Sequence, residues 1–525
     1  MKWGGVQYDA IVIGGGHNGL AAAARLASGG ARVLLAEAGS RVGGAAVTAE
    51  ITPGYSASAV AHLLEGFPRR IERKLKLHRH GLRYAARNVA TVALDRDGHH
   101  ILLPRTRKEF SGFRDLLPKD AGAYREYVAR RRALAEFVAP LLGERPPALN
   151  DPEALKRFLR RSVWRAALKG GRTMQSLLRA LPEAIGDRLD AEFESTLLKG
   201  ALAFDATLGG SEGPYAPGTS FRAVLREAIR MQGQGVSLPV GGMGAFSDAL
   251  AASIAAAGGD IRIDTRVVRV LVEGGRAVGV ELSGGLEVRA ALILSAVAPR
   301  TTMLDLVGAR HVETDDIREL RHLVPRGAAA KVNLALDRLP KFSGLAPELY
   351  GSRLLVAPSL AELDEGANAA RGGELPLEPM MEVLLPSVTD PLLAPEGQHV
   401  MSVIVQSVPY AMAGGWDMHR EVLVQRVVRT LGHYAPGIED MMIAGEFLTP
   451  PDIEEKYGLA GGDWHQGDLR LDRLFAFRPA PAYGGYETPL PGLWLCGAGS
   501  HPGGGITGLP GWLAAGAILA DGGSA

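Results

Sequence analysis

The sequence contains very little cysteine: Cys496 is the single one in 525 residues. A lone cysteine excludes an intramolecular disulfide, a CxxC redox pair and a cysteine-based zinc site. The His, Asp and Glu residues form no cluster with metal-ligand spacing, so we expect no metal ion. Chemistry that needs a protein dithiol is therefore excluded.

Net charge and long apolar runs are also lacking. The formal net charge is +1 at pH 7, so no global field attracts nucleic acid, and we expect no nucleic-acid partner. No stretch approaches the roughly 20 apolar residues that span a bilayer. The apolar run at 10–13 is too short for a signal peptide, and no Arg- and Ser-rich presequence precedes Tyr8. We therefore expect a cytoplasmic protein of roughly two to four domains.

Glycine, in contrast, is abundant, with 68 residues, and the first glycine-rich motif lies near the N-terminus. Residues 8–13 (YDAIVI) predict a strand, and the alanine-rich residues 18–28 predict a helix. Between them, Gly14, Gly16 and Gly19 form GxGxxG in the strand–turn–helix context that indicates a dinucleotide site. Gly14 allows the tight turn, Gly16 leaves room for a pyrophosphate, and Gly19 lets the helix pack closely on the strand. The helix N-terminus would supply N–H groups to the phosphates.

The residues after the second predicted strand indicate the type of dinucleotide. Glu37 ends this strand and is placed to accept hydrogen bonds from an adenosine ribose. It is followed by AGSRVGG, which contains Ala38, Arg41, Gly43 and Gly44. This second glycine pair resembles the extended fingerprint of glutathione-reductase-like FAD proteins, which NAD does not require. We therefore predict FAD as the cofactor.

A second dinucleotide motif is not evident. Its best candidate, VGGMGAF at 240–246, lacks the GxGxxG spacing and precedes a helix. With one cysteine as well, the chain does not fit a disulfide reductase. We therefore expect oxygen or a quinone, rather than bound NAD(P), as the electron acceptor.

The C-terminal segment at 492–521 carries the second strong signal. It is predicted as a strand, a glycine loop and a final helix that opens near Ile506 and Thr507. Backbone N–H groups freed by these glycines, including Gly505, can face the electron-rich edge of a reduced flavin. We also expect cofactor contacts from Gly497 and, in the middle of the chain, from Val268.

Cofactor motifs at both ends of one chain imply a discontinuous domain. The predicted fold class is α/β, in part α+β, with a glutathione-reductase-like FAD-binding Rossmann domain and an inserted substrate domain of mixed sheet and helices. Helical periodicity dominates from about 108 to 232, and strand patterns return afterwards. We expect a hairpin at 88–103, with two strands around an Asp97-Gly98 turn, and further strands at 259–296, 329–336, 381–387 and 399–410. The FAD-binding domain is expected at 1–105, 236–300 and 481–525, and the substrate domain at 106–235 and 301–480.

Several segments together resemble the phytoene desaturase-like superfamily of FAD-dependent oxidoreductases, in particular the subgroup of pyridine nucleotide-disulfide oxidoreductase domain-containing protein 2. They include IVIGGGHNGL, EAGSRVGGAAVT, KGALAFDA, GGMGAFSDAL, KVNLALDRLP and LWLCGAGSHPGGGITG. The resemblance implies that hydrogen is removed from, or added to, carbon–carbon bonds of apolar molecules. Carotenoid desaturases and amine oxidases of this fold usually carry Arg after the second glycine pair, where this chain has Ala45, so both of those substrate classes are disfavoured.

Two histidines are candidates for catalysis, because imidazole suits proton transfer near neutral pH. The resemblance places His465 in a loop near the flavin, and His501 adjoins the C-terminal glycine loop. Each could instead be a hydrogen-bonding spacer. His62 and Tyr215 are further candidates.

The basic stretch at 156–172 has seven Lys or Arg and no acid, with large apolar residues at helical spacing. Such a segment can contact a membrane surface peripherally, whereas a solvated charged face or a contact between subunits of an oligomer is the alternative. The leading function is an FAD-dependent dehydrogenase (desaturase) of an apolar small molecule. The alternatives are a saturase, an isomerase, an amine oxidase and a prenyl- or lipid-binding protein without flavin.

Overall fold

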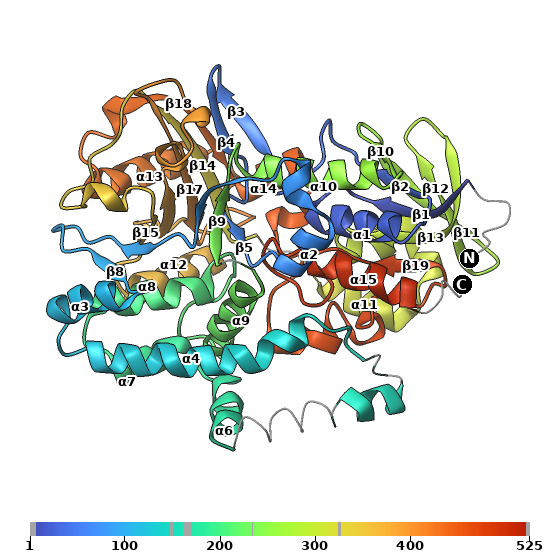
Figure 1. Ribbon diagram of the computed structural model, residues 1–525, viewed down its shortest axis with the longest axis horizontal. Coiled ribbons are helices and arrows are strands. Elements are labelled where there is room, and N and C mark those ends of the chain that lie inside the picture. Colours follow the sequence, from blue (N-terminus) through green and yellow to red (C-terminus); the bar gives the residue numbers. More distant parts are fainter. Residues whose placement is uncertain are drawn as a thin grey trace.

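The computed structural model describes residues 7–147, 149, 151–158, 160, 171–233, 235–323 and 327–520. It contains two seven-stranded sheets, each covered by helices, with a helical layer beside the second sheet (Figure 1). The architecture confirms the predicted α/β class with a mixed sheet and helices inserted between the two ends of the cofactor domain.

The first sheet has the strand order β10-β2-β1-β13-β12-β11, and β19 pairs with β13. Its core is parallel: β1 pairs in parallel with both β2 and β13. All six residues of β1 are buried, as expected for a parallel strand that is covered on both faces. The strands are β1 (Tyr8–Ile13), β2 (Val33–Ala36), β10 (Asp260–Arg262), β11 (Val267–Glu273), β12 (Arg276–Leu282), β13 (Glu287–Ser295) and β19 (Leu493–Leu495).

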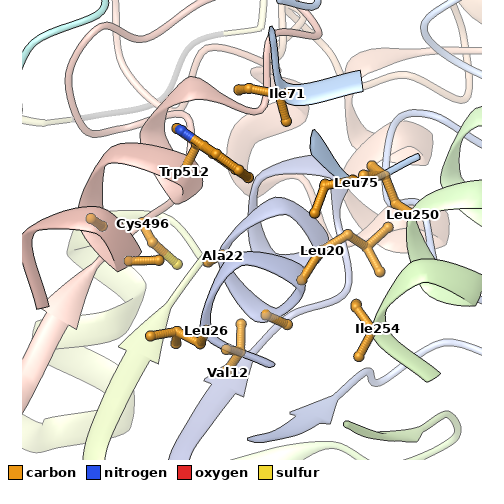
Figure 2. Packing of buried hydrophobic residues seen from close by; sticks show 14 of the residues in the cluster. Val12, Leu20, Ala22, Leu26, Ile71, Leu75, Leu250, Ile254, Cys496 and Trp512 are labelled. Atoms are coloured by element: carbon orange, nitrogen blue, oxygen red, sulfur yellow. The ribbon is translucent and has the colours of Figure 1, made fainter. Parts of the chain in front are cut away.

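Three helices cover one face of this sheet: α1 (His17–Ser28), α10 (Met243–Ala256) and α15 (Leu509–Ala520). Figure 2 shows α1 between the other two, with Leu20 near Leu250 and with Val12 of β1 beneath the helix. The alanines of α1 allow this close packing, and a Cβ at Gly511 of α15 would lie 1.8 Å from the Asn18 carbonyl oxygen. The small residues of the predicted helix therefore serve helix–helix contact.

The opposite face of the first sheet packs against residues beyond the expected domain boundary at 300. Met303, in a π-helix at Thr301–Gly308, and Leu320, in α11 (Thr314–His322), lie in one core with Ile11 of β1. The assignment of these residues to the substrate domain is thus wrong. Position in the sequence alone did not reveal that these residues cover the first sheet.

The second sheet has the order β18-β14-β17-β16-β15-β7-β8 and is antiparallel except at β15–β7. The predicted hairpin at 88–103 is confirmed, but it pairs with β15 and so belongs to this sheet rather than to the FAD-binding domain. A hairpin signal is local and does not identify the sheet that the hairpin joins. The strands are β7 (Thr91–Ala93), β8 (Ile101–Leu103), β14 (Ala329–Leu336), β15 (Arg353–Val356), β16 (Met381–Leu384), β17 (His399–Gln406) and β18 (Met442–Leu448).

The two faces of the second sheet differ in polarity. Val332 and Leu334 of β14 share a core with α13 (Arg420–Tyr434), whereas Lys331 and Asn333 alternate with them and point to the other face. Both polar residues are only 1% exposed. The face opposite α13 therefore buries polar groups.

The helical prediction for 108–232 is confirmed in the residues of this range that the structure describes. The described helices there are α3 (Arg107–Leu116), α4 (Ala121–Leu142), α6 (Gly171–Ala180), α7 (Ile185–Glu192), α8 (Thr196–Thr207) and α9 (Thr219–Gln232). The basic stretch at 156–172 lies mainly outside the described residues. Among the helices of the described ranges, none combines the length and apolar composition that crossing a bilayer requires.

The remaining elements include two smaller sheets and three further helices. A three-stranded sheet has the order β5-β9-β6, and β3 pairs with β4. These elements are β3 (Thr48–Thr52), β4 (Tyr55–Ser58), β5 (Leu64–Glu65), β6 (Tyr84–Arg87), β9 (Val236–Pro239), α2 (Arg69–Lys74), α12 (Leu360–Arg371) and α14 (Pro450–Tyr457).

Candidate functional site

A cavity of about 940 Å³ lies between the two sheets. Its walls combine the ends of β1 and β2, the C-terminal glycine loop, helices α8 and α9, and residues of β16 and β17. The cavity thus joins both predicted cofactor motifs to the polar face of the second sheet.

The first glycine motif forms one end of this cavity. Gly14 turns the chain with φ +92°, and a Cβ at Gly19 would lie 2.0 Å from the Gly14 carbonyl oxygen. A Cβ at Gly16, in contrast, would meet no atom within 4 Å, so open space lies in front of this residue. Gly16 is also the N-cap of α1 and provides no side-chain cap, which leaves the helix N-terminus available to an anion. This cradle fits a diphosphate.

Glu37 follows β2 and lines the same end of the cavity. Its carboxylate accepts hydrogen bonds from the backbone N–H of Gly15, at 2.6 Å, and of Gly39, at 2.7 Å. Ala38 and Arg41 line the cavity beside it. The carboxylate is held at the wall with further lone pairs for the hydroxyls of a ribose.

The C-terminal loop forms the wall on another side. Gly503, Gly504 and Gly505 all have positive φ, a conformation that favours glycine. Gly504, Gly505 and Ile506 line the cavity, and the sequence analysis predicts cofactor contacts for Gly505 and Ile506. This loop brings main chain, rather than side chains, against the cavity.

Of the other predicted cofactor residues, Gly44 lines the cavity, whereas Gly43, Gly497 and Thr507 lie just behind this lining. Gly43 donates its N–H to the Gly15 carbonyl, and a Cβ at Gly497 would lie 2.4 Å from the Ala296 carbonyl oxygen. Helix α15 begins at Leu509, two residues later than predicted, and Thr507 therefore lies before the helix. The Thr507 hydroxyl accepts a hydrogen bond from the Leu509 N–H. These residues shape the loops that line the cavity.

Val268 requires a correction. Its side chain is 42% exposed, whereas the neighbouring Val267 is buried and lines the cavity. The side chains of successive residues in a strand point to opposite sides. A prediction that is displaced by one position therefore selects a surface residue, Val268, in place of a cavity residue, Val267.

His465 lines the cavity, and its neighbours fix its orientation. The Trp464 indole N–H donates to His465 Nε2 at 3.1 Å, so the proton of the neutral ring must lie on Nδ1. Its backbone N–H donates to Asp463, and its carbonyl accepts from Arg478 at 2.6 Å. Burial, reinforced by the Arg478 charge, lowers the pKa of His465 to about 3. The ring is therefore neutral at physiological pH.

His501 and Tyr215 lie away from the cavity wall. His501 is 1% exposed, and its Nε2 is 3.1 Å from the Leu141 carbonyl oxygen of α4. Tyr215 is 40% exposed and donates its hydroxyl to Asp190 at 2.7 Å. The structure thus brings one of the two principal histidine candidates to the cavity.

Sequence reasoning missed a buried group of charges, which we name the ionic cluster. Two ion pairs show its geometry: Arg226 Nη2 lies 3.0 Å from Glu65 Oε2, and Arg353 Nη2 lies 2.7 Å from Asp205 Oδ1. Burying an ion without a partner is unfavourable, and here each charge has an opposite neighbour. The ionic cluster consists of Glu65, Asp205, Arg226, Arg230, Arg353 and Glu382.

His62 and Lys331 extend the ionic cluster. His62 lines the cavity, with Nε2 2.7 Å from Glu382 and Nδ1 3.0 Å from the Lys331 ammonium nitrogen. Lys331 also donates to Ser402 at 2.6 Å. Burial lowers the pKa of Lys331 to about 7 and that of His62 to about 4, where the Lys331 charge contributes as well. His62 is therefore neutral near pH 7.

A sequence signal for these residues exists. The apolar strands β14, β15 and β16 each contain one charged residue that is at most 1% exposed: Lys331, Arg353 and Glu382. Charged residues are almost never fully buried unless they are paired. One charge in each of several apolar strands therefore predicts a shared polar site, although not its location.

The comparisons with known proteins agree with this geometry. The family described as flavin containing amine oxidoreductase matches residues 19–519. Pyridine nucleotide-disulfide oxidoreductase domain-containing protein 2 of Rattus norvegicus is 36% identical over 98% of this chain and 94% of its own length. A phytoene desaturase (neurosporene-forming) of Rhodobacter capsulatus is 24% identical over 98% of this chain and 93% of its own.

A solved structure also shares the fold. The crystal structure of an oxidoreductase from Methanosarcina mazei superposes with a TM-score of 0.62 and 18% identity, covering 97% of this chain and 99% of the other. The resemblance predicted from the sequence motifs and the FAD cofactor are both confirmed.

Proposed function

We propose, from the premise that the chain belongs to the family of flavin-containing amine oxidoreductases, that this FAD-dependent oxidoreductase dehydrogenates a carbon–carbon bond of an apolar small molecule. The observation that supports the proposal is the cavity itself, which continues from the cofactor cradle into a region with aliphatic walls. Its aliphatic side chains are Val47, Val60, Leu63, Leu208, Leu225, Ile229, Ile404, Leu459 and Leu469.

Different residues of the described chain would bind different parts of FAD. Gly16 and the N-terminus of α1 would hold the diphosphate, Glu37 the ribose, and Gly504 and Gly505 the ring system. When bound, FAD supplies the oxidising chemistry by accepting a hydride from the substrate carbon. The chain's own contribution is to orient that carbon and to exclude water.

The aliphatic wall suits an apolar substrate because burying apolar surface is favourable, by about 25 cal/mol for each Å². Ala45 lines the cavity at the position where related enzymes usually carry arginine. Its methyl group adds apolar surface and no charge there. One of the relatives is named a phytoene desaturase, and desaturation is the removal of hydrogen from a carbon–carbon bond.

His465 supports this reaction as a neutral residue beside the glycine loop. A Cβ at Gly504 would lie 3.6 Å from His465 Nδ1. With its ring orientation fixed by Trp464, His465 shapes the wall at the reactive end of the cavity. We propose that it positions the substrate there, and that oxygen or a quinone accepts the electrons afterwards.

The test is an anaerobic titration of the purified yellow protein with hydroaromatic and terpenoid compounds. Bleaching of the flavin absorption together with a product two hydrogen atoms lighter by mass spectrometry would support the proposal. Bleaching by primary amines with release of ammonia would indicate amine oxidation instead. Bleaching by NADPH alone would indicate a saturase.

A further inference from the structure

Part of the ionic cluster is accessible from the cavity. The side chains of Glu65, Asp205 and Arg226 line it and remain 13%, 15% and 18% exposed. Glu382 also lines the cavity, although its side chain is only 2% exposed, and the Arg353 side chain behind it is 1% exposed. The cavity wall here offers carboxylate oxygens and guanidinium N–H groups to a bound molecule.

This polar wall adjoins the C-terminal glycine loop. A Cβ at Gly505 would lie 3.5 Å from Ile229 Cγ2 and 3.8 Å from the Glu65 carbonyl oxygen. The Arg226 charge also helps to lower the pKa of His465. A polar group bound at Glu65 and Arg226 therefore belongs to a molecule that lies at the reactive end of the cavity.

The charges of the ionic cluster are balanced, with three arginines and three carboxylates. Burial alone would raise the pKa of Glu65, but Arg226 and Arg230 outweigh it and lower that pKa. Arg230 and Arg353 likewise hold the pKa of Asp205 well below its ordinary value despite burial. The carboxylates are therefore ionised at neutral pH, and each is compensated inside the cluster.

A balanced pair discriminates between types of polar group. A charged group on the substrate would have to break an existing pair or enter without a counter-charge, and both are unfavourable in a buried site. An uncharged group with one donor and one acceptor satisfies both partners, because it donates to the carboxylate and accepts from the guanidinium.

We infer that the substrate carries one uncharged group that both donates and accepts hydrogen bonds, such as a hydroxyl or a carboxamide, on an otherwise apolar body, and that Glu65 and Arg226 bind this group. The inference rests on the proposed function and adds the substrate class to it.

The test compares octane, octanol, octanoate and octylamine as probes of the wild-type holoenzyme at about pH 8, where Lys331 is mainly neutral. Binding is measured as a shift of the flavin absorption band. Octanol is expected to bind roughly tenfold more tightly than each of the others, because only its hydroxyl can both donate to the Glu65 carboxylate and accept from the Arg226 guanidinium. Equal binding of octane, or tighter binding of either charged probe, would overturn the inference.

Two charge-removing variants sharpen the test. Glu65→Gln leaves an unpaired positive charge, so octanoate should gain over octanol by roughly tenfold; Arg226→Gln leaves a negative charge, so octylamine should gain instead. Glu455→Gln removes a charge from the cavity wall outside the ionic cluster and should leave the ranking unchanged. If the relative affinities for octanoate and octylamine changed in the same direction in both variants, or did not change, the inference would be contradicted.

The proposed function fails in a different way. A colourless wild-type protein, or one bleached only by NADPH, would count against dehydrogenation whatever the ranking of the probes. If a variant loses its FAD, the ranking on the wild-type protein decides, because it needs no substitution.

Discussion

The two ends of the cavity are built on different principles. At the cofactor end, main chain forms the wall, and Gly16 and Gly504 leave space that a side chain would fill or strain. At the other end, side chains from β5, α8, α9, β15 and β16 meet in the ionic cluster. A wall of main chain can bind the same cofactor in many proteins, whereas a wall of side chains can differ with the substrate.

The largest effect is expected from the buried side of the ionic cluster. Arg353→Leu would leave Asp205 and Glu382 without their shared partner in a site where Arg353 is 1% exposed. Breaking a buried pair in this way costs about 3–5 kcal/mol of the free energy of unfolding. Urea denaturation followed by circular dichroism measures this loss.

The control for this prediction is Arg269→Leu. Arg269 forms an ion pair with Glu281 on the surface, where its side chain is 51% exposed. Exposed pairs contribute roughly 0–1 kcal/mol. A loss for Arg353→Leu as small as that for Arg269→Leu would mean that the ionic cluster does not stabilise the fold.

The next effect concerns the cofactor end. Gly16→Ala adds a methyl group where no protein atom lies within 4 Å, so the stability of the apoprotein should change little. The methyl group would occupy the space for the diphosphate, and the Kd for FAD should rise by roughly a hundredfold, or about 2.7 kcal/mol. Fluorescence titration of the apoprotein with FAD gives this value.

Gly19→Ala provides the contrast. Its Cβ would lie 2.0 Å from the Gly14 carbonyl oxygen, so this variant should destabilise the apoprotein itself. If Gly16→Ala bound FAD as tightly as the wild type, the open space before Gly16 would not be the diphosphate site.

A pH effect of intermediate size should come from Lys331. Its pKa falls from about 10.5 in the unfolded chain to about 7 in the fold because burial disfavours the charged form. Between these values the unfolded state binds more protons, so the stability should rise with pH, by about 2 kcal/mol from pH 7 to pH 9 from this residue. Urea denaturation at several pH values measures the slope, which Lys331→Met should remove.

A stability that is flat or falls over this range in the wild type, with no difference from Lys331→Met, would show that Lys331 is protonated in the fold. The ionic cluster would then carry a net positive charge, and the balance on which the uncharged substrate group depends would be lost.

The success of the sequence analysis follows the same division between main chain and side chains. Gly14, Gly16 and Glu37 belong to one local strand–turn–helix–strand unit, and local spacing was enough to place them. The position of Val268 was wrong because a strand exchanges its inner and outer sides with every residue. The ionic cluster joins residues as far apart as Glu65 and Glu382, and no local pattern contains such a contact.

The predicted domain boundaries were wrong in places for the same reason, because local patterns do not contain long-range contacts. The hairpin at β7 and β8 was recognised from its turn, but its partner β15 lies about 250 residues later in the chain. Similarly, the π-helix that contains Met303 covers the first sheet, although the chain around it continues into the second. Local signals specify elements, and long-range pairing decides where the elements assemble.

The smallest effect is expected from the two histidines, of which His465 lines the cavity and His501 lies behind the lining. His465→Asn should lower turnover of an identified substrate by roughly tenfold, because it alters a cavity residue whose ring Trp464 orients. His501→Asn should change turnover by less than about twofold, since the amide can still donate to the Leu141 carbonyl behind the wall. Steady-state turnover with a matched FAD content measures both. If His501→Asn were the more damaging change while the flavin spectrum stayed the same, the loop behind the cavity, and not only its lining, would take part in catalysis.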